Sequence, residues 1–284
     1  MCRCADFRCA DDAFNSYLNI SSKLVRYKMK IITWNCNMAF RKKAEFILAY
    51  KPDIVVVQEC ECIEKLIFGS GVQLPTDALW FGNNQNKGLG IFSYSDLRFK
   101  VIESHRKDLQ TIVPIAVTGG EFGFNLFAIW ANNPGDPDGQ YIEQVWKAIH
   151  HYDGLLSAKQ NILAGDFNSN TIWDRKRRPG NHSNVVKRLA EKGIYSAYHL
   201  YHGQTQGNEQ HPTFYLYRNQ TKAYHLDYCF VSDNLAKQIL AVELGAYDFW
   251  AKHSDHVPLI ITMDTVNLTR TNFNGYGSVP NPGN

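Results

Sequence analysis

Short apolar runs alternate with amphipathic segments through most of the chain. Residues 30–34 and 53–58 have the length and β-branched content of strands, and the run at 54–57 predicts a strand buried on both faces. Residues 40–50 and 140–157 carry apolar side chains at helical spacing. Further strand-like runs follow at 78–81, 89–94, 99–103, 111–117, 122–130, 161–164, around 195, 213–217, 225–231, 242–246 and 257–263.

Many strands with few intervening helices predict two packed sheets with helices outside them. The expected fold class is therefore α/β, with two mixed sheets in one catalytic domain over residues 29–264. Residues 1–28 lack sustained periodicity and are interpreted as a poorly structured leader. Residues 265–284, rich in Asn, Gly, Pro and Thr, are interpreted as a flexible tail. Ser183 is expected to cap a helix that ends near Gly193.

The composition is that of an ordinary globular protein. Of the 284 residues, 44% are hydrophobic and 20% are charged, which is enough apolar material for a sizeable core. No apolar stretch is long enough to span a bilayer and no secretory signal is visible, so we expect a cytoplasmic protein, and a monomer. The seven cysteines lack the spacing of a disulfide framework or a zinc knuckle, and are interpreted as reduced thiols.

Acidic and amide side chains close several of the apolar runs. Asn35 and Glu59 each end one strand, Asp166 and Asn168 follow another, and Asp227 lies inside a fourth. Such groups are costly in apolar surroundings unless they share a task. Binding a divalent cation and cutting a phosphoester is a task that uses this set. Taken singly, each also has an ordinary explanation as a solvated strand end or an Asx-turn.

The segment Ser254-Asp255-His256 adds an imidazole and another carboxylate. Asp227 needs a partner, and a hydrogen bond to His256 would fix the imidazole tautomer and raise its pKa. Asp255 would then point toward the metal. Alone, the segment could equally be a loop before the last strand. In this order along the chain, the residues predict a phosphate-hydrolysing site.

A basic run supplies candidate substrate contacts. The net charge is only +3, but Arg175-Lys176-Arg177-Arg178 begins seven residues after Asn168. Arg175 and Arg177 could therefore border the same cleft and attract a phosphate backbone. A solvated loop is the alternative. Asn133, in the polar loop after the strand at 122–130, is a further candidate.

An aromatic segment supplies two more candidates. Period-two alternation over residues 214–217 would bury Phe214 and Leu216 and expose Tyr215 and Tyr217. Exposed tyrosines near a basic cleft could stack on bases. The alternative is that tyrosine simply suits strands.

Five short motifs carry a resemblance to a known family: Thr33-Trp34-Asn35, Val57-Gln58-Glu59, Gly165-Asp166-Phe167-Asn168, His225-Leu226-Asp227-Tyr228 and Ser254-Asp255-His256. Over about residues 30–263, the chain resembles the endonuclease/exonuclease/phosphatase superfamily. This superfamily includes exonuclease III, apurinic endonucleases, pancreatic-type deoxyribonuclease, sphingomyelinases and inositol polyphosphate 5-phosphatases. The resemblance implies a four-layer α/β/β/α sandwich.

The resemblance also implies roles for the site residues. They divide into a Mg²⁺ environment (Asn35, Glu59, Asp255), residues that handle the nucleophile and the transition state (Asp166, Asn168), and a histidine with its support (His256, Asp227). Two positions depart from the apurinic endonuclease pattern. Asn37 stands where those enzymes usually have Asp, and Trp130 where they carry a phosphate-contacting Tyr, so the case for abasic-site repair is weaker. The Cys-Asp-Arg element of inositol polyphosphate 5-phosphatases is absent, and 226–228 resembles the nuclease form.

Together these features predict a Mg²⁺-dependent phosphodiesterase, with Mn²⁺ able to substitute for the metal. The favoured substrate is nucleic acid, DNA rather than RNA, cut by in-line attack of water. One alternative keeps the chemistry but changes the substrate to a small phosphoester, such as a phospholipid headgroup or a sugar phosphate. Another is an inactive relative that only binds nucleic acid. The complete set of acidic residues argues against that one.

Overall fold

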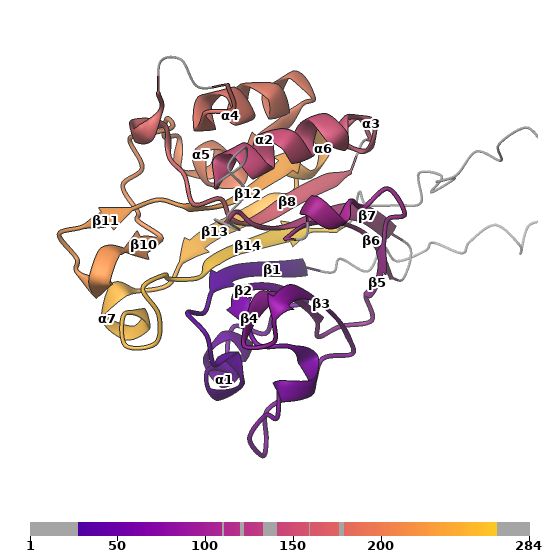
Figure 1. Cartoon of the computed structure of the whole chain (residues 1–284), viewed down its shortest axis with the longest axis vertical. Helices are drawn as coiled ribbons and strands as arrows, with labels where there is room; N and C mark the ends of the chain where they lie inside the picture. Colours follow the sequence, from indigo (N-terminus) through magenta and orange to yellow (C-terminus); the bar gives the residue numbers. More distant parts are fainter. Residues whose placement is uncertain are drawn as a thin grey trace, which may run out of the picture.

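The computed structural model describes residues 28–109, 111–119, 122–132, 141–158, 160–175 and 179–265. Within these ranges the strands form two six-stranded sheets and a small two-stranded ribbon. Figure 1 shows the two large sheets stacked face to face. The leader up to residue 27 and the tail from residue 266 lie outside the described residues, so the predicted domain boundaries stay predictions.

The first sheet combines the N-terminal strands with the last two strands of the domain. Its only parallel pair is β1 with β2, and its other neighbours are antiparallel. In sheet order, the strands are β13 (Ile239–Leu244), β14 (Leu259–Asp264), β1 (Lys28–Asn35), β2 (Ile54–Cys60), β4 (Lys87–Ser93) and β3 (Asp77–Asn84).

The second sheet is built from the middle of the chain. Its only parallel pair is β7 with β8. In sheet order, the strands are β5 (Arg98–Val101), β6 (Ile112–Gly119), β7 (Phe122–Trp130), β8 (Asn161–Asp166), β12 (Asp227–Ser232) and β9 (Ile194–Ser196). The ribbon pairs β10 (Phe214–Tyr215) with β11 (Ala223–Tyr224).

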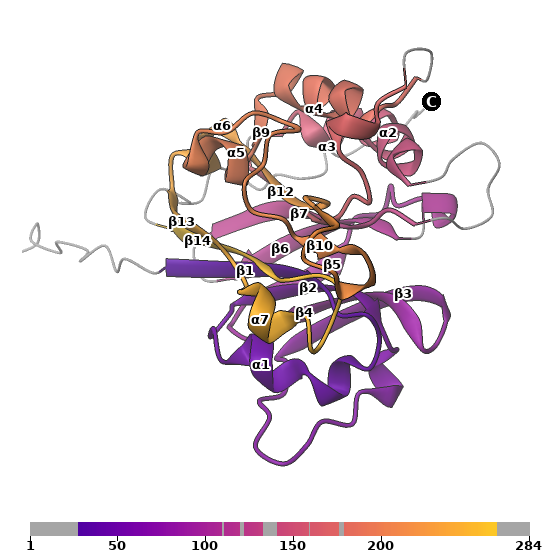
Figure 2. The same cartoon turned by 90° about the vertical axis from the view of Figure 1, so that its left-hand side faces the viewer.

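Helices cover the outer faces of both sheets, as Figure 2 shows from the side. Over the second sheet lie α2 (Ile142–His151), α3 (Asp153–Leu156), α4 (His182–Glu191), α5 (Ala197–His202) and α6 (Asp233–Ala236), and outside the first sheet lie α1 (Ala44–Leu48) and α7 (Tyr247–Trp250). Single 3₁₀ turns are η1 (Phe40–Lys42), η2 (Ile63–Lys65), η3 (Lys107–Leu109), η4 (Thr171–Trp173) and η5 (Leu216–Arg218). The predicted four-layer α/β/β/α sandwich is confirmed. No helix among the described residues is both long and apolar enough to cross a bilayer.

The alternation of side chains along β2 explains how its apolar run holds the layers together. Ile54 and Val56 belong to the core between the sheets, while Val55 and Val57 belong to the core beneath α1. All four are fully buried, as the unbroken apolar run predicted. Burying one such side chain stabilises the fold by about 1.5–3 kcal/mol.

Three local predictions need correction. The helix expected at 140–157 is divided into α2 and α3 at Tyr152, which is not helical. The helix expected at 40–50 contains a 3₁₀ turn followed by the short α1. The cap of α4 is Asn181, not Ser183, and the N–H of Asn181 donates to Asn184 Oδ1 at 3.1 Å. Asn is as good a cap as Ser, so the pattern alone could not choose between them.

Candidate functional site

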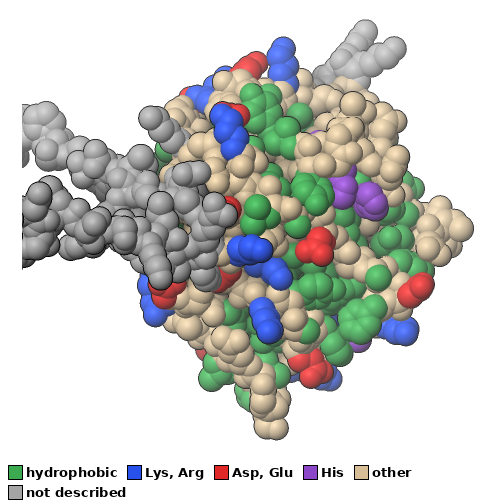
Figure 3. All heavy atoms as spheres, turned by 180° about the vertical axis from the view of Figure 1, so that it is seen from behind, with side chains coloured by type: hydrophobic (Ala, Val, Ile, Leu, Met, Phe, Trp, Pro, Cys, Tyr) green, Lys and Arg blue, Asp and Glu red, His purple; other side chains and the backbone are tan. Residues whose placement is uncertain are grey.

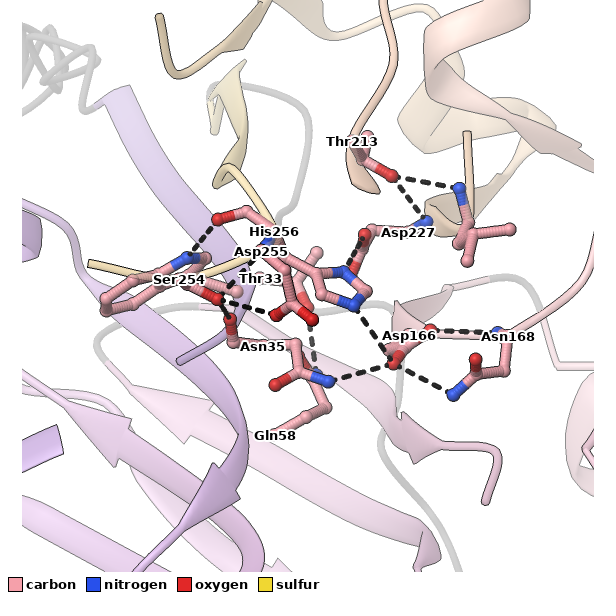
Figure 4. A network of polar contacts seen from close by, with 12 residues as sticks. Thr33, Asn35, Gln58, Asp166, Asn168, Thr213, Asp227, Ser254, Asp255 and His256 are labelled. Carbon is pink, nitrogen blue, oxygen red and sulfur yellow. Dashed lines mark hydrogen bonds and ion pairs between the residues drawn. The ribbon is translucent and has the colours of Figure 1, made fainter. Parts of the chain in front are cut away.

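The polar residues singled out by the sequence come together at one edge of the two sheets. Asn35 ends β1, Asp166 ends β8 and Asp227 begins β12, while His256 precedes β14. In Figure 4 the imidazole of His256 lies between the carboxylates of Asp227 and Asp166. Strands from both sheets therefore place these side chains in one cluster, as the order of the motifs predicted.

Asp166 is the centre of the cluster and is fully buried. Its Oδ2 accepts hydrogen bonds from Asn35 Nδ2 and Asn168 Nδ2, both at 3.1 Å, and its Oδ1 accepts from the Asn168 N–H at 2.8 Å. Burial raises the pKa of Asp166 to about 7; His256 opposes this rise and Asp227 adds to it. A carboxylate with a pKa near neutrality suits a general base.

The backbone after β8 is shaped for this carboxylate. A Cβ at Gly165 would lie 1.8 Å from the Ile129 carbonyl oxygen, so only glycine allows β7 and β8 to approach this closely. Asn168 has a φ of 48°, a left-handed conformation that non-glycine residues adopt at some cost. That conformation lets both nitrogens of Asn168 reach Asp166.

His256 is held by a hydrogen bond to Asp227, with Nδ1 2.8 Å from Oδ2. Burial lowers the pKa of His256, but Asp227 and Asp166 together outweigh it and raise the value to about 10. His256 is thus a cation whose free Nε2–H faces Asp166 Oδ2 at 4.0 Å. Thr213 Oγ1 accepts from the Asp227 N–H at 3.0 Å and anchors that end of the pair.

Hydrogen bonds also fix the segment that carries His256. Ser254 Oγ donates to the Asn35 carbonyl at 2.7 Å and accepts from the His256 N–H at 3.0 Å. The indole N–H of Trp34 donates to the His256 carbonyl at 3.0 Å. The Thr33-Trp34-Asn35 and Ser254-Asp255-His256 motifs therefore support each other across the first sheet.

Glu59 lies at an irregularity of β2. The register with β4 shifts between Gln58 and Cys60, and Glu59 has a φ of 60°. A bulge of this kind re-aims a side chain. Glu59 Oε1 lies 3.2 Å from Lys87 Nζ and 3.5 Å from Asn35 Nδ2, and the side chain is 19% exposed.

A chain of contacts links Glu59 to Asp255. Asn35 Oδ1 accepts from the Asn37 N–H at 3.1 Å, and Asn37 Nδ2 donates to Asp255 Oδ1 at 3.0 Å. The two carboxylates and the amide oxygen of Asn35 are hard ligands of the type that Mg²⁺ prefers. The Glu59 carboxylate already faces one positive charge, that of the Lys87 ammonium. This donor set fits Mg²⁺.

A second group could also hold a metal ion. Asp166, Asp227 and His256 each place one ligand atom within 4.8 Å of the others. However, all three are buried and the His256 Nδ1 is already bonded to Asp227. Because Mg²⁺ retains waters and favours oxygen ligands, this group fits a hydrogen-bonded triad better than a magnesium site.

The structure places two of the other predicted residues, apart from the two tyrosines, near the site. Trp130, 8% exposed, lies beside the site with Lys87 Nζ 5.6 Å from its ring. Arg175 is exposed and, with Asn168, lines a side cleft of about 280 Å³, so this end of the basic run does border the site. Asn133 and Arg177 lie outside the described residues.

The prediction for Tyr215 is wrong. Tyr215 is buried, its ring packs 4.5 Å from that of Tyr247, and its N–H donates to the Asp255 carbonyl at 2.8 Å. Phe214, expected in the core, instead contacts His256 with ring centroids 4.8 Å apart. Within β10 the alternation has the opposite sense to the prediction, because Tyr215 joins the core on the α1 side of the first sheet and Phe214 faces His256. The strand then ends, and Tyr217 adopts a φ of 56°. Tyr217 is 83% exposed, as expected.

The sequence did not identify Lys87 or Thr213 as site residues. Lys87 begins β4, far from every motif in the sequence, and the pairing of β2 with β4, with its register shift at Glu59, brings the two together. Thr213 precedes an aromatic run, and no motif around it predicts that its hydroxyl accepts hydrogen bonds from the Leu226 and Asp227 N–H groups. Neither role could be read without the tertiary structure.

Comparison with known proteins agrees with this geometry. Residues 32–256 match the model of the Endonuclease/Exonuclease/phosphatase family. The chain belongs to this family. As a member of the Endonuclease/Exonuclease/phosphatase family, it is a phosphoric ester hydrolase. No curated protein matches the chain.

Solved structures of the same fold include three nucleic-acid enzymes. An AP endonuclease from Archaeoglobus fulgidus is 19% identical with a TM-score of 0.59, covering 83% of this chain and 99% of its own. The 3' phosphatase NExo from Neisseria, bound to product DNA hairpin, is 19% identical with a TM-score of 0.56 and the same coverage. The endonuclease domain of TRAS1, a telomere-specific non-LTR retrotransposon, is 18% identical with a TM-score of 0.56, covering 84% and 98%. At these identities the likeness establishes the fold.

Proposed function

We propose that this hydrolase is a Mg²⁺-dependent phosphodiesterase that cuts DNA. The observation that carries the proposal is the convergence of Asn35, Asn168 and His256 on the Asp166 carboxylate, with Glu59 and Asp255 beside it. Phosphodiesters resist attack because their anionic oxygens repel a nucleophile. A base, hydrogen-bond donors and a cation site in one place address that barrier.

The chain's own residues supply most of the chemistry. Asp166 accepts a proton from water, whose oxygen then bonds to phosphorus as the bond from phosphorus to the leaving oxygen breaks. The His256 Nε2–H, and the Asn168 amide once it exchanges its bonds to Ala131 and Asp166, would donate to the nonbridging oxygens as charge builds on them. Asp227 keeps His256 protonated and oriented.

Glu59 and Asp255, with Asn35, would hold the metal. When bound there, Mg²⁺ or Mn²⁺ would neutralise the phosphate and stabilise charge on the leaving oxygen. Lys87 occupies the space beside Glu59 and would contribute to the same positive environment. The metal dependence is thus expected to reside in the partly exposed carboxylates and not in the buried triad.

DNA is the favoured substrate for two reasons. Arg175 adds a cation beside Asn168, and the Neisseria phosphatase of the same fold was bound to product DNA hairpin. On the face seen in Figure 3, basic and acidic side chains are interspersed. Because that face carries no broad basic patch and the net charge of the chain is only +3, affinity for DNA should come from contacts near the site. A monomeric state and a cytoplasmic location accompany this proposal.

The cleft beside the site favours a second candidate. About 730 Å³ of space adjoins Glu59 and Asn168, a volume typical of small-molecule sites. A small phosphoester could therefore be the substrate of the same chemistry. A nucleotide is also of that size, so the same cleft is compatible with nuclease activity.

An assay of substrate classes tests the proposal. The full chain is incubated with Mg²⁺ and plasmid, single-stranded oligonucleotides, abasic duplex, RNA or generic phosphoesters, with a chelator control. Hydrolysis of DNA that requires metal and weakens steeply with salt is the expected result, because DNA binding releases counterions. Cleavage of small phosphoesters alone, insensitive to salt, would favour the second candidate.

A further inference from the structure

A cleft of about 730 Å³ lies next to the candidate site and is not explained by the hydrolytic chemistry. Glu59, Trp130 and Asn168 form its border with the site, and the turn between β3 and β4 forms another wall. If a phosphate binds between Asp166 and Glu59, one of the groups esterified to it would therefore lie in or along this cleft.

The lining of the cleft is rich in amide side chains. Asn84 is the last residue of β3, and Asn132 and Gln144 come from the opposite wall. Asn132 is fixed in place, since its Nδ2 donates to Thr111 Oγ1 at 3.3 Å and its N–H donates to Gln144 Oε1 at 3.1 Å. Asn and Gln combine a donor and an acceptor and match the edges of nucleobases. Such edges are accessible when a base is unpaired.

Lys87 lies where the cleft meets the site. Its Nζ is 3.2 Å from Glu59 Oε1 and 5.6 Å from the centre of the Trp130 ring, and 40% of the side chain is exposed. A lysine so placed can pair with a phosphate that arrives from the cleft side. A cation next to an aromatic ring and a row of amides matches the three parts of a nucleotide: phosphate, base face and base edge.

The size of the cleft limits the form of the nucleic acid. A volume of about 730 Å³ is within the range of sites that enclose one small molecule. A base within a duplex could enter only after leaving its partner and its stack, which costs a few kcal/mol and least at an unpaired base. The cleft is therefore suited to one unpaired nucleotide.

We propose that this cleft binds an unpaired nucleotide attached to the scissile phosphate, so that single-stranded or frayed DNA is the preferred substrate class. The inference rests on the proposed function and deepens it. Lys87 binds the phosphate that adjoins the cleft, and Asn84 and Asn132 hold the base. The chain then hydrolyses the ester bond at the boundary between the cleft and Asp166.

The test compares substrates of one sequence in three forms: a single strand, a blunt duplex and a duplex with an unpaired 3' end. Full-length chain with Mg²⁺ should cleave the single strand and the unpaired end with a kcat/KM at least about tenfold above that of the blunt duplex, because an unpairing cost of 1.4 kcal/mol already gives tenfold. Equal kcat/KM values for all three forms would overturn the inference.

Variants of the cleft connect this preference to the residues. Lys87→Gln and Asn84→Ala should each raise the KM for the single strand by about five- to tenfold, a loss of contacts that are made in the bound state. Lys100→Gln, an exposed lysine on the edge strand β5, is the matched control and should leave KM unchanged. Thermal unfolding verifies that each variant is folded. An unchanged KM in both cleft variants would contradict the inference.

Failure of the proposed function looks different. If no form of DNA is cleaved while a generic phosphodiester is, then the nuclease proposal fails and the cleft inference fails with it. If duplex and single strand are cleaved equally, the nuclease proposal stands and only the cleft inference fails.

Discussion

The two halves of the candidate site differ in how they are built. The buried half contains Asp166, Asp227 and His256, all with side chains at most 5% exposed and bonded to other protein groups. The open half contains Glu59, Asp255 and Lys87, where Glu59 is 19% and Lys87 40% exposed. The buried half is held by its own hydrogen bonds, with only Asp227 Oδ1 left unpaired among the described residues, whereas the carboxylates of the open half are partly exposed.

Under the proposed function, we expect the two halves to divide the work of catalysis. Groups that move protons gain from burial, because a low-dielectric setting shifts their pKa values and fixes their geometry. Groups that take up a hydrated cation must remain accessible, because Mg²⁺ keeps part of its water. Changes in the buried half should therefore alter turnover or stability, while changes in the open half should alter metal and substrate affinity.

The largest effect is expected from Asp166→Asn. The amide keeps the shape of the side chain but cannot accept a proton, so kcat should fall about 10³-fold. Asp233→Asn, an exposed carboxylate paired with Lys237, is the control and should retain full turnover. Steady-state kinetics with Mg²⁺ measure both. Near-normal turnover of folded Asp166→Asn would remove the proposed base.

Glu59→Gln should weaken Mg²⁺ binding by at least about 100-fold with less effect on stability, because loss of a charged ligand costs more than the 10–100-fold seen for residues that only support ligands. Calorimetric titration with Mg²⁺ measures the affinity directly. Glu191→Gln, which changes an exposed carboxylate paired with Arg188, should not alter it. An unaltered affinity in Glu59→Gln would place the metal elsewhere, with the triad of the buried half as the next candidate.

The sequence named all three residues of the buried half, and in the open half it named Glu59 and Asp255 but not Lys87. Asp166 and Asp227 interrupt apolar runs, and buried charges of this kind need partners, so their pairing could be anticipated. Lys87 could not, because its approach to Glu59 depends on a bulge in β2 that has no glycine or proline to mark it. Exposed lysines are common, and position along the chain carries no information about such a contact.

The same contrast applies to the fold. Residues 54–57 are all apolar, so a strand made of them must be buried on both faces, as it is. Tyr215 was misassigned because a strand of only two residues does not specify which of its faces is buried; Tyr215 joins the core and Phe214 faces His256. The sandwich is thus determined by long apolar runs, whereas the surface near the substrate depends on turns that short patterns do not specify.

A moderate effect on stability is expected from Thr213→Val in the support of the buried half. Thr213 Oγ1 accepts from the buried Leu226 and Asp227 N–H groups at 2.9 and 3.0 Å. Valine keeps the shape but leaves both donors unpaired, at a cost of about 2 kcal/mol. Urea unfolding measures the loss. Thr221→Val, on the exposed turn before β11, should change stability by less than about 0.5 kcal/mol, and equal losses would show that burial of these donors is not decisive.

The smallest effect concerns the response to acid of a histidine that packs behind the buried half. His182 is buried, packs 4.8 Å from the Tyr228 ring behind the Asp166 loop, and leaves its Nδ1 without a hydrogen bond among the described residues. Burial lowers the pKa of His182 to about 4 from the usual 6.5. Between these pH values His182 binds a proton in the unfolded chain but not in the folded chain. The contribution of neutral His182 to stability is therefore complete above pH 6.5 and is lost as the pH falls toward 4.

From pH 7.5 to 5.5 this proton uptake should cost the unmodified chain about 1 kcal/mol more than it costs His182→Gln, since one pH unit below the unfolded pKa corresponds to about 1.4 kcal/mol. Urea midpoints at the two pH values give the difference. His150→Gln, an exposed histidine on α2, is the control and should follow the unmodified chain. If His182→Gln loses as much stability as the control, then the neutral state of His182 does not contribute to the acid sensitivity of the fold. Other buried groups must then account for it. His225 is one such group, because burial also lowers its pKa to about 4.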